Sequence, residues 1–228
     1  MLIVIAFIAV AIAISAGRGG GPPKPGSTQA KRDAAAVATL LRGIPQSGTT
    51  LGSPRAPVTV TEFADLECSV CRSFALGAEK ELIAHEVRPG RVKLVYRSLC
   101  TATCTGPLGH SGFIEQQSAA YAAGLQGLGW YYIALFYEEQ GAEGTSYVTP
   151  RYLDALARQI PRLEYRKWQS DSRRERLRAQ LDADGSAAAA QGFAATPTIV
   201  VKGPRGRAQP IVGAPDFATL QSAIRSVR

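Results

Sequence analysis

The residues best suited to chemistry are two cysteines three positions apart, in the segment Cys68-Ser69-Val70-Cys71. The chain of 228 residues has only 4 cysteines, and its hydrophobic fraction of 46% is enough to build a core without disulfide cross-links. A pair at this spacing can form a structural disulfide, supply half of a zinc site or exchange electrons as a redox centre. The surrounding sequence has to distinguish these three uses.

The position of the pair favours redox chemistry. A segment with strand-type alternation ends just before Cys68, and a helical pattern follows it. Free N–H groups and the dipole at a helix N-terminus stabilise a thiolate, which is the nucleophilic form of cysteine. We therefore expect Cys68 to be the nucleophile and Cys71, one turn into the helix, to be the resolving cysteine.

Cys100 and Cys104 form a second close pair, and the favoured interpretation is a local structural disulfide. The chain-entropy model gives such a short loop only about 2 kcal/mol of stabilisation. A second redox pair that relays electrons to Cys68 and Cys71 stays open, as do two free thiols. A different class of protein also stays open: a redox-inactive binding or interaction domain in which all four cysteines hold one zinc ion. We expect no metal, because the elements between the two pairs are long and regular.

The elements that must position these cysteines can be inferred from periodicity. The alternation of Val58, Val60, Glu62 and Ala64 predicts a strand with these side chains on one face. The segment RSFALGAEKELIAHEV predicts a helix that ends near Gly90, and RVKLVYRSL predicts a second strand. The cysteine pair therefore lies at the first junction of a strand-helix-strand unit.

The rest of the chain is predicted to complete this unit around a helical insertion. Near the C-terminus, TPTIVVKG and AQPIVGA predict two paired strands, followed by a helix that opens at Pro215. The segment from about residue 101 to 195 is far longer than a parallel crossover requires, so it must form structure of its own. We expect one long helix over residues 113–139, another opening at Thr149-Pro150, and one or two more over residues 161–191.

The segments EFADLECSVC and GFAATPTIVV, separated by a helical insertion, resemble the DsbA-like branch of the thioredoxin superfamily. The resemblance implies an α/β protein over residues 43–228, with a thioredoxin-like fold and an inserted helical domain at about 101–195. It implies a thiol-disulfide oxidoreductase that needs no cofactor and oxidises cysteine pairs in exported proteins. It further implies a quinone-linked membrane partner for reoxidation. A disulfide reductase or isomerase with the same centre stays open.

The resemblance also implies the residues that contact the substrate. Pro197 is expected to be cis and to lie against the redox pair, and Thr196 to present backbone groups to an extended substrate segment. Ser69 and Val70, between the cysteines, are expected to contact the substrate as well. Strongly oxidising members of the family have a histidine where this chain has Val70, so we expect a less extreme oxidant.

Glu62 matches the position where the family keeps a buried acid near the sulfurs. A carboxyl group buried there has a raised pKa and can transfer protons for Cys71. A glutamate that points to solvent from an edge strand is the alternative. Asp65 and Glu67 lie nearer to the cysteines in the sequence, and we expect them on an exposed rim.

The N-terminus indicates where the protein works. Residues 1–16 are predicted to be a membrane anchor or signal segment, although no basic residue precedes this apolar run and it is short for a bilayer core of about 30 Å. An uncleaved anchor whose true start lies upstream is favoured over a cleaved signal and over a buried segment. Residues 17–32 have the composition of a flexible Gly/Pro-rich linker. An anchor or a signal places the rest of the chain in an extracytoplasmic compartment, where disulfides persist.

Composition excludes several other functions. The net charge of +8 suits an anionic surface, yet aromatic residues are few and no nucleic-acid motif is present, so we expect no nucleic-acid partner. His85 and His110 are expected at the surface, and no serine lies in the Gly-x-Ser-x-Gly pattern of a hydrolase. Trp130 and the tyrosines beside it are expected in the core.

Overall fold

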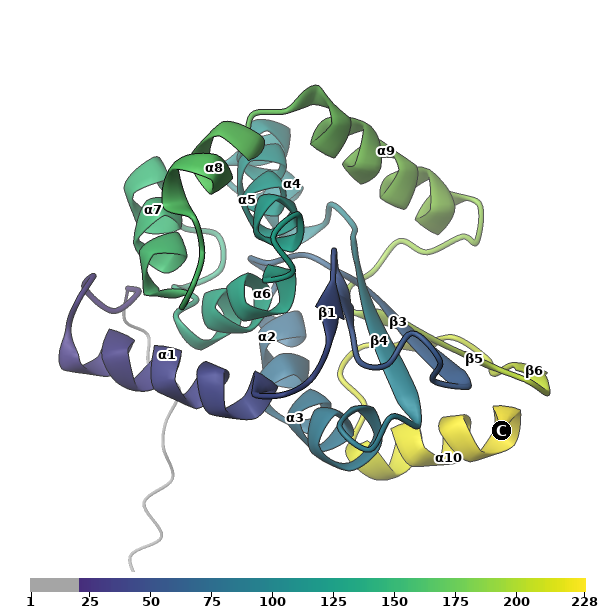
Figure 1. The fold of residues 1–228 in the computed structure, drawn as a ribbon. Coiled ribbons are helices and arrows are strands. Elements are labelled where there is room, and N and C mark those ends of the chain that lie inside the picture. The colour runs from purple at the N-terminus through teal and green to yellow at the C-terminus, as the bar shows by residue number, and fades with distance from the viewer. Residues whose placement is uncertain (1–20) are drawn as a thin grey trace, which may run out of the picture.

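The structure is a computed structural model that describes residues 21–228, so the predicted anchor over residues 1–16 lies outside the described residues. Within residues 21–228, no helix has the length and apolar character needed to cross a membrane. One mixed sheet has the strand order β1-β2-β4-β3-β5-β6, and β7 also pairs with β5 (Figure 1). The strands are β1 (Gln46–Ser47), β2 (Thr50–Leu51), β3 (Val58–Ala64), β4 (Val92–Ser98), β5 (Thr198–Gly203), β6 (Gly206–Arg207) and β7 (Ile211–Val212).

Strand β3 lies at the centre of the sheet, parallel to β4 and antiparallel to β5. Its alternation puts Val58 and Val60 on the face that packs into the main core. Phe63 belongs to a smaller cluster with Ala188 of helix α9 (Glu175–Ala189), on the other face of the sheet. The two covered faces of this mixed sheet confirm the predicted α/β fold class.

The helix predicted after the cysteine pair is divided into three parts. Helix α2 (Ser69–Leu76), helix α3 (Ala78–Leu82) and the π-helix η1 (Ile83–Val87) follow one another. Gly77 separates the first two, because its φ of −108° and ψ of −110° lie outside the helical region. A Cβ at this position would lie 3.0 Å from the carbonyl oxygen of Ser73, so a larger residue would crowd the end of α2.

Helices α4 to α9, all between β4 and β5, form the predicted helical insertion, which lies above the sheet in Figure 1. They are α4 (Ala102–Thr105), α5 (Gly109–Gly124), α6 (Gly129–Glu138), α7 (Pro150–Gln159), α8 (Tyr165–Asp171) and α9. The helix predicted to open at Thr149-Pro150 is α7, where the Thr149 side chain accepts a hydrogen bond from the N–H of Tyr152.

The prediction of one long helix over residues 113–139 is wrong. Helix α5 ends at Gly124 and α6 begins at Gly129. A Cβ on Gly124 would lie 2.8 Å from the carbonyl oxygen of Gly48, and a Cβ on Gly129 would lie 2.5 Å from the same atom. Glycine at both positions therefore lets the turn between β1 and β2 pack directly against the junction of the two helices.

Helix α1 (Thr28–Leu41) begins inside residues 17–32, the range predicted as linker. The Ser27 side chain caps it by accepting a hydrogen bond from the N–H of Ala30. Ala30 and Val37 are buried, and the helix packs against α6. This tertiary contact orders residues whose composition predicted a tether, so the predicted linker extends too far towards the C-terminus.

The C-terminal part has the predicted order of strand, strand and helix, with two differences. The return strand is divided into β6 and β7, both paired with β5. Helix α10 (Phe217–Val227) is capped by Asp216, so Pro215 precedes the helix instead of opening it. The buried stripe of α10, which includes Leu220 and Ile224, packs below the sheet in Figure 1 against β5 and α3.

Candidate active site

The predicted redox pair lies where β3 turns into α2. Cys68 is the N-cap of α2, and its Sγ accepts a hydrogen bond from the N–H of Cys71 at 3.5 Å. Cys68 is 6% exposed and Cys71 is fully buried, and both are free thiols in this structure. One sulfur is therefore within reach of another protein, and its partner is shielded one helical turn behind it.

The two thiols have opposite pKa shifts. The pKa of Cys68 is lowered from its ordinary value of 9.0 to about 6. The largest cause is a hydrogen bond with Cys71, and hydrogen bonds with the Thr196 side chain and with backbone N–H groups add to it. Burial has the opposite effect and raises this pKa. The pKa of Cys71 is raised well above 9.0, mainly by burial and next by its contact with Cys68. At neutral pH Cys68 is the thiolate of the pair and Cys71 keeps its proton.

The structure brings Thr196 and Pro197 against this pair from the far end of the chain. The Thr196–Pro197 peptide bond is cis, and the Cys68 thiol donates to the carbonyl oxygen of Thr196 at 3.5 Å. The two residues between the cysteines are accessible: Ser69 is exposed, and Val70 is 43% exposed. The carbonyl oxygen of Thr196 therefore contacts the Cys68 sulfur, and Ser69 and Val70 follow Cys68 at the accessible start of α2.

Glu62 is fully buried on the central strand β3, which excludes the alternative of a solvent-facing glutamate on an edge strand. Burial raises the pKa of Glu62 well above 4.5, and the neighbouring charge of Glu79 raises it further. Glu79, from α3, is 2% exposed, and burial raises its pKa to about 7. The two carboxyl groups can share a proton, because a protonated carboxyl donates to an ionised one.

Sequence reasoning missed Glu79. The available signal was its place three residues before the buried Leu82 of α3, on the helix face that packs inward. A carboxylate at such a position is usually assigned to solvent, because a buried charge needs a partner that the sequence does not reveal.

The expectation that Asp65 and Glu67 form an exposed rim is wrong, because both are fully buried. The Asp65 carboxylate accepts hydrogen bonds from the backbone N–H groups of Glu67, Thr101 and Thr103, so it ties β3 to the segment after β4. Burial raises the pKa of Glu67 to about 7. Hydrogen bonds to a distant segment, which no local pattern reveals, account for the burial of Asp65.

The structure joins Cys100 and Cys104 by a disulfide, with a Cα–Cα distance of 5.7 Å. His110 lies beside it, with Nδ1 at 3.7 Å from the Cys104 sulfur and 4.0 Å from the Cys100 sulfur. Among the described residues, these three are the group that could hold a metal ion, and Cys68 and Cys71 are not part of it. The geometry therefore does not support one zinc ion held by all four cysteines.

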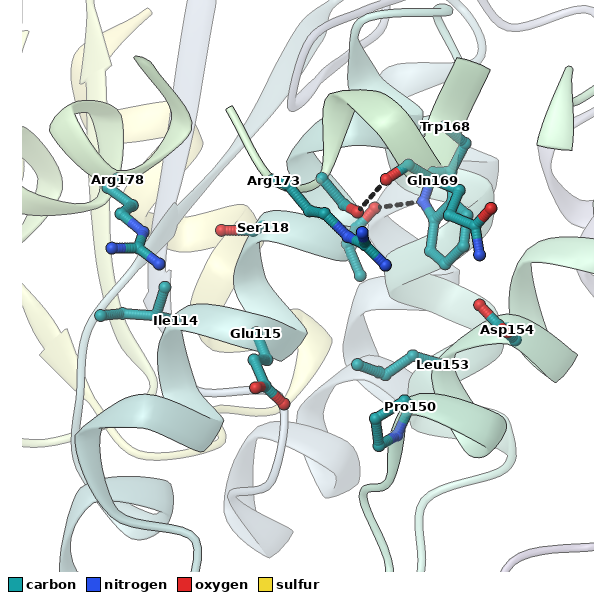
Figure 2. A pocket seen from close by; sticks show the side chains of 12 residues that line it. Ile114, Glu115, Ser118, Pro150, Leu153, Asp154, Trp168, Gln169, Arg173 and Arg178 are labelled. Carbon is teal, nitrogen blue, oxygen red and sulfur yellow. Dashed lines mark hydrogen bonds between the residues drawn. The ribbon is translucent and has the colours of Figure 1, made fainter. Parts of the chain in front are cut away.

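A separate pocket of about 310 Å³ lies within the helical insertion (Figure 2). Its lining residues come from α5, α7, α8 and the segment around the start of α9, and include Ile114, Leu153, Trp168 and Arg173. The Trp168 indole N–H donates to the carbonyl oxygen of Ala119 at 2.8 Å, which fixes one wall of the pocket. No residue predicted for the redox site lines it.

Comparison with known proteins identifies the class. A family model described as Thioredoxin matches residues 46–225. The chain belongs to the thioredoxin family. Its fold is that of the DsbA-like branch, as predicted, with the helical insertion in the same overall architecture as the solved structures.

The individual relatives are distant in sequence. BdbD from Bacillus subtilis, in its oxidised form, has a TM-score of 0.67 at 20% identity, covering 91% of this chain and 96% of that chain. DsbA from Chlamydia trachomatis has a TM-score of 0.64 at 22% identity, covering 78% of this chain and 90% of that chain. The probable disulfide bond formation protein D of Bacillus anthracis is 22% identical over 175 residues, which are 76% of this chain and 75% of that protein.

Proposed function

We propose that this chain catalyses thiol-disulfide exchange outside the cytoplasm and oxidises cysteine pairs in exported proteins through Cys68 and Cys71. The observation that carries the proposal is the pKa of Cys68, lowered to about 6 next to a buried Cys71 that keeps its proton. A stabilised thiolate favours the reduced form of the enzyme, which makes its disulfide a better oxidant. The names of the distant relatives, disulfide bond formation protein D and DsbA, support the same chemistry.

The reaction begins with the enzyme in its disulfide form. A substrate thiolate attacks Sγ of Cys68, the Cys68–Cys71 bond breaks, and Cys71 leaves as a thiolate that takes up a proton. A second substrate thiolate then attacks the substrate sulfur of the mixed disulfide, and Cys68 leaves as a stabilised thiolate. Two electrons pass from the substrate to the enzyme, and the substrate gains a disulfide.

Glu62 is the proposed source of the proton that Cys71 takes up. Its raised pKa keeps the carboxyl group protonated at neutral pH. Once Glu62 has given up this proton, its negative charge raises the pKa of Cys71 and so favours transfer of the proton to that sulfur. Glu79 helps to retain that proton, because two adjacent carboxyl groups resist ionising together. In the reverse direction the ionised pair would take the proton back.

The proposed substrate segment crosses Cys68 in extended form beside Thr196 and Pro197. A groove of about 630 Å³ lies along Ser69, Arg72 and Ser73 of α2, the helix that Cys68 caps. We propose that it receives substrate side chains that extend beyond the reacting disulfide. A quinone-linked membrane protein is the proposed partner that reoxidises the enzyme, and the segment over residues 1–16 is its proposed attachment to the membrane.

Reduction or isomerisation of disulfides with the same residues is the second candidate. The observation that favours it is Val70, an apolar side chain that offers the Cys68 thiolate no positive charge. A thiolate stabilised by hydrogen bonds alone gives a less oxidising disulfide than one that also has a neighbouring cation.

The test is the equilibrium of the Cys68–Cys71 pair with glutathione, measured on the full chain carrying Cys100→Ala and Cys104→Ala. An oxidase is easily reduced by glutathione, whereas a pair that stays oxidised contradicts the proposed direction. In a second step, Cys71→Ala should capture cysteine-containing proteins as mixed disulfides, and Cys68→Ala should capture none. If Cys71→Ala captures nothing, the pair is a structural bridge and the proposed activity is wrong.

A further inference from the structure

Cys100, Cys104 and His110 form a cluster of two sulfurs and one imidazole ring outside the redox pair. Their ligand atoms, one from each residue, all lie within 4.8 Å of one another. Both cysteines are half-buried and His110 is exposed, so an ion can reach the cluster from solvent. Thiolate sulfur and imidazole nitrogen are the ligands that zinc prefers in proteins.

The distances from His110 to the two sulfurs already fit a zinc site. Its Nδ1 is 3.7 Å from the Cys104 sulfur and 4.0 Å from the Cys100 sulfur. A tetrahedral zinc ion, with Zn–S bonds of about 2.3 Å and a Zn–N bond of about 2.0 Å, holds a sulfur and a nitrogen ligand about 3.5 Å apart. The two sulfurs, bonded here as a disulfide, would have to separate to about 3.8 Å. Side-chain rotation can provide this separation, because the two Cα atoms lie 5.7 Å apart.

Hydrogen bonds hold the backbone between the two cysteines in addition to the disulfide. The buried carboxylate of Asp65 accepts from the N–H of Thr101 at 2.9 Å and from the N–H of Thr103 at 3.0 Å. The N–H of Thr105 donates to the carbonyl oxygen of Thr101 at 3.1 Å, at the start of α4. We therefore expect reduction to free the two sulfurs while the backbone that carries them stays in place.

His110 is presented by a second element, which the disulfide does not include. It lies in the first turn of α5, and α5 packs against α4. Its ring stacks on the buried Phe113, with the ring centroids 6.2 Å apart and an interplanar angle of 22°. A cavity of about 290 Å³ adjoins Cys100 and His110, which leaves room for water at the fourth position of a tetrahedral ion.

We propose that Cys100, Cys104 and His110 form a zinc site when the disulfide between the two cysteines is reduced. A dithiol transfers two electrons to the S–S bond, which breaks, and the dithiol leaves as a disulfide. The two new thiols lose their protons as zinc binds, so two thiolates and a neutral imidazole hold the ion. A disulfide compound takes the two electrons back, which reforms the S–S bond and releases the ion. The site therefore binds zinc in one redox state and releases it in the other.

The proposed site does not depend on the redox pair or on the proposed exchange reaction. Cys68 and Cys71 are not among its ligands, so it differs from a zinc site held by all four cysteines. Both can be replaced by serine for the test, which leaves Cys100 and Cys104 as the only cysteines of the chain.

The first test measures zinc binding by the full chain with Cys68→Ser and Cys71→Ser. This chain is reduced with a dithiol, desalted without oxygen and titrated with zinc against a coloured chelator. The reduced form should bind one zinc ion per chain, and the disulfide form should bind none. His110→Ala should weaken binding by at least about tenfold, the smallest loss typical of changes outside a ligand set. His85→Ala, at the other histidine of the chain and also exposed, is the matched control and should bind zinc as before.

A second readout identifies the ligands. Cobalt(II) replaces zinc, because its bonds to thiolates produce an ultraviolet absorption band that bonds to imidazole or water do not. The band should appear in the reduced form and be absent from the disulfide form. Zinc should also raise the melting temperature of the reduced chain, since an ion that binds the folded state stabilises it, and His110→Ala should lose most of this rise.

Three results would overturn the proposal: a reduced chain that binds no zinc, equal binding in the two redox states, or equal losses in His110→Ala and His85→Ala. Melting temperatures of the two histidine variants without zinc should agree, which excludes unfolding as the cause of lost binding. The cobalt band is measured with all three ligands in place, so it decides the question even if His110→Ala folds poorly. A reduced chain without this band contradicts the site.

Discussion

Cys68 is made reactive by hydrogen bonds at the start of α2. The effects that lower its pKa are hydrogen bonds from Cys71, from the Thr196 side chain and from the backbone N–H groups of Cys71 and Val70. The side chain of Val70 adds nothing to them, although it is 43% exposed beside the sulfur. A polar or charged group at this position therefore has room and acts directly on the thiolate.

Replacing Val70 by histidine should lower the pKa of Cys68 by about one pH unit, because an imidazolium cation next to the sulfur favours the thiolate. The Cys68–Cys71 disulfide should then be reduced more readily, which is measured as a shift of its equilibrium with glutathione. Val70→Thr has a similar volume and no charge, so it serves as the matched control and should leave the equilibrium near its original value. An unchanged equilibrium in Val70→His would mean that the histidine does not reach the sulfur.

At the scale of elements, the N-terminus of α2 serves two anions. It stabilises the thiolate of Cys68, and the N–H of Ser69 also donates to a carboxylate oxygen of Glu143 at 2.6 Å. Glu143 belongs to the exposed loop between α6 and α7. A carboxylate bound at the same helix terminus disfavours a second negative charge there, so we expect the loop to reduce the effect of the helix terminus on Cys68.

Glu143→Gln should therefore lower the pKa of Cys68. The shift should be smaller than one pH unit, because an exposed charge is screened by solvent and salt. Titration of the Cys68 thiolate at low and high ionic strength measures it, and the difference from the original chain should shrink at high salt. Glu175→Gln, at an exposed position at the start of α9, is the control. A shift that persists unchanged at high salt would contradict an electrostatic origin.

The elements could be predicted where their own periodicity determines them. Strand β4 and the first part of β3 bury alternate residues, and that pattern is visible in the sequence. The break between α5 and α6 was missed, because it depends on Gly124 and Gly129 approaching Gly48, a contact between distant segments. Strands β1 and β2 are only 2 residues each, too short to show any period.

At the scale of the whole molecule, the motif residues could be predicted and their polar surroundings could not. The segments with Cys68 and with Thr196-Pro197 carry local signatures, and the fold brings them together. Asp65 carries none, because its carboxylate is held by backbone N–H groups far away in the chain. Buried polar groups are placed by tertiary contacts, which is why this part of the site needed the structure.

The stability of the whole molecule depends on pH through its buried carboxyl groups. Burial is the main cause of the raised pKa of four glutamates: Glu62, raised well above 4.5, and Glu67, Glu79 and Glu139, each raised to about 7. In the unfolded chain these groups ionise near 4.5. Because their pKa is higher in the folded state, the stability that these protonated groups contribute is fully present below about pH 4.5. It is lost as the pH rises through about 7.

The free energy of unfolding of the oxidised chain should therefore decrease between about pH 5 and about pH 8, with each group adding at most about 1.4 kcal/mol per pH unit to the slope. The oxidised form is used because Cys68, with its lowered pKa, would act in the opposite direction if it could titrate. Denaturant unfolding at several pH values measures the slope. Glu67→Gln stays uncharged at every pH, so it should flatten the slope, whereas Glu175→Gln at the surface should not. A slope of the opposite sign would mean that these carboxyl groups are charged and paired in the folded protein.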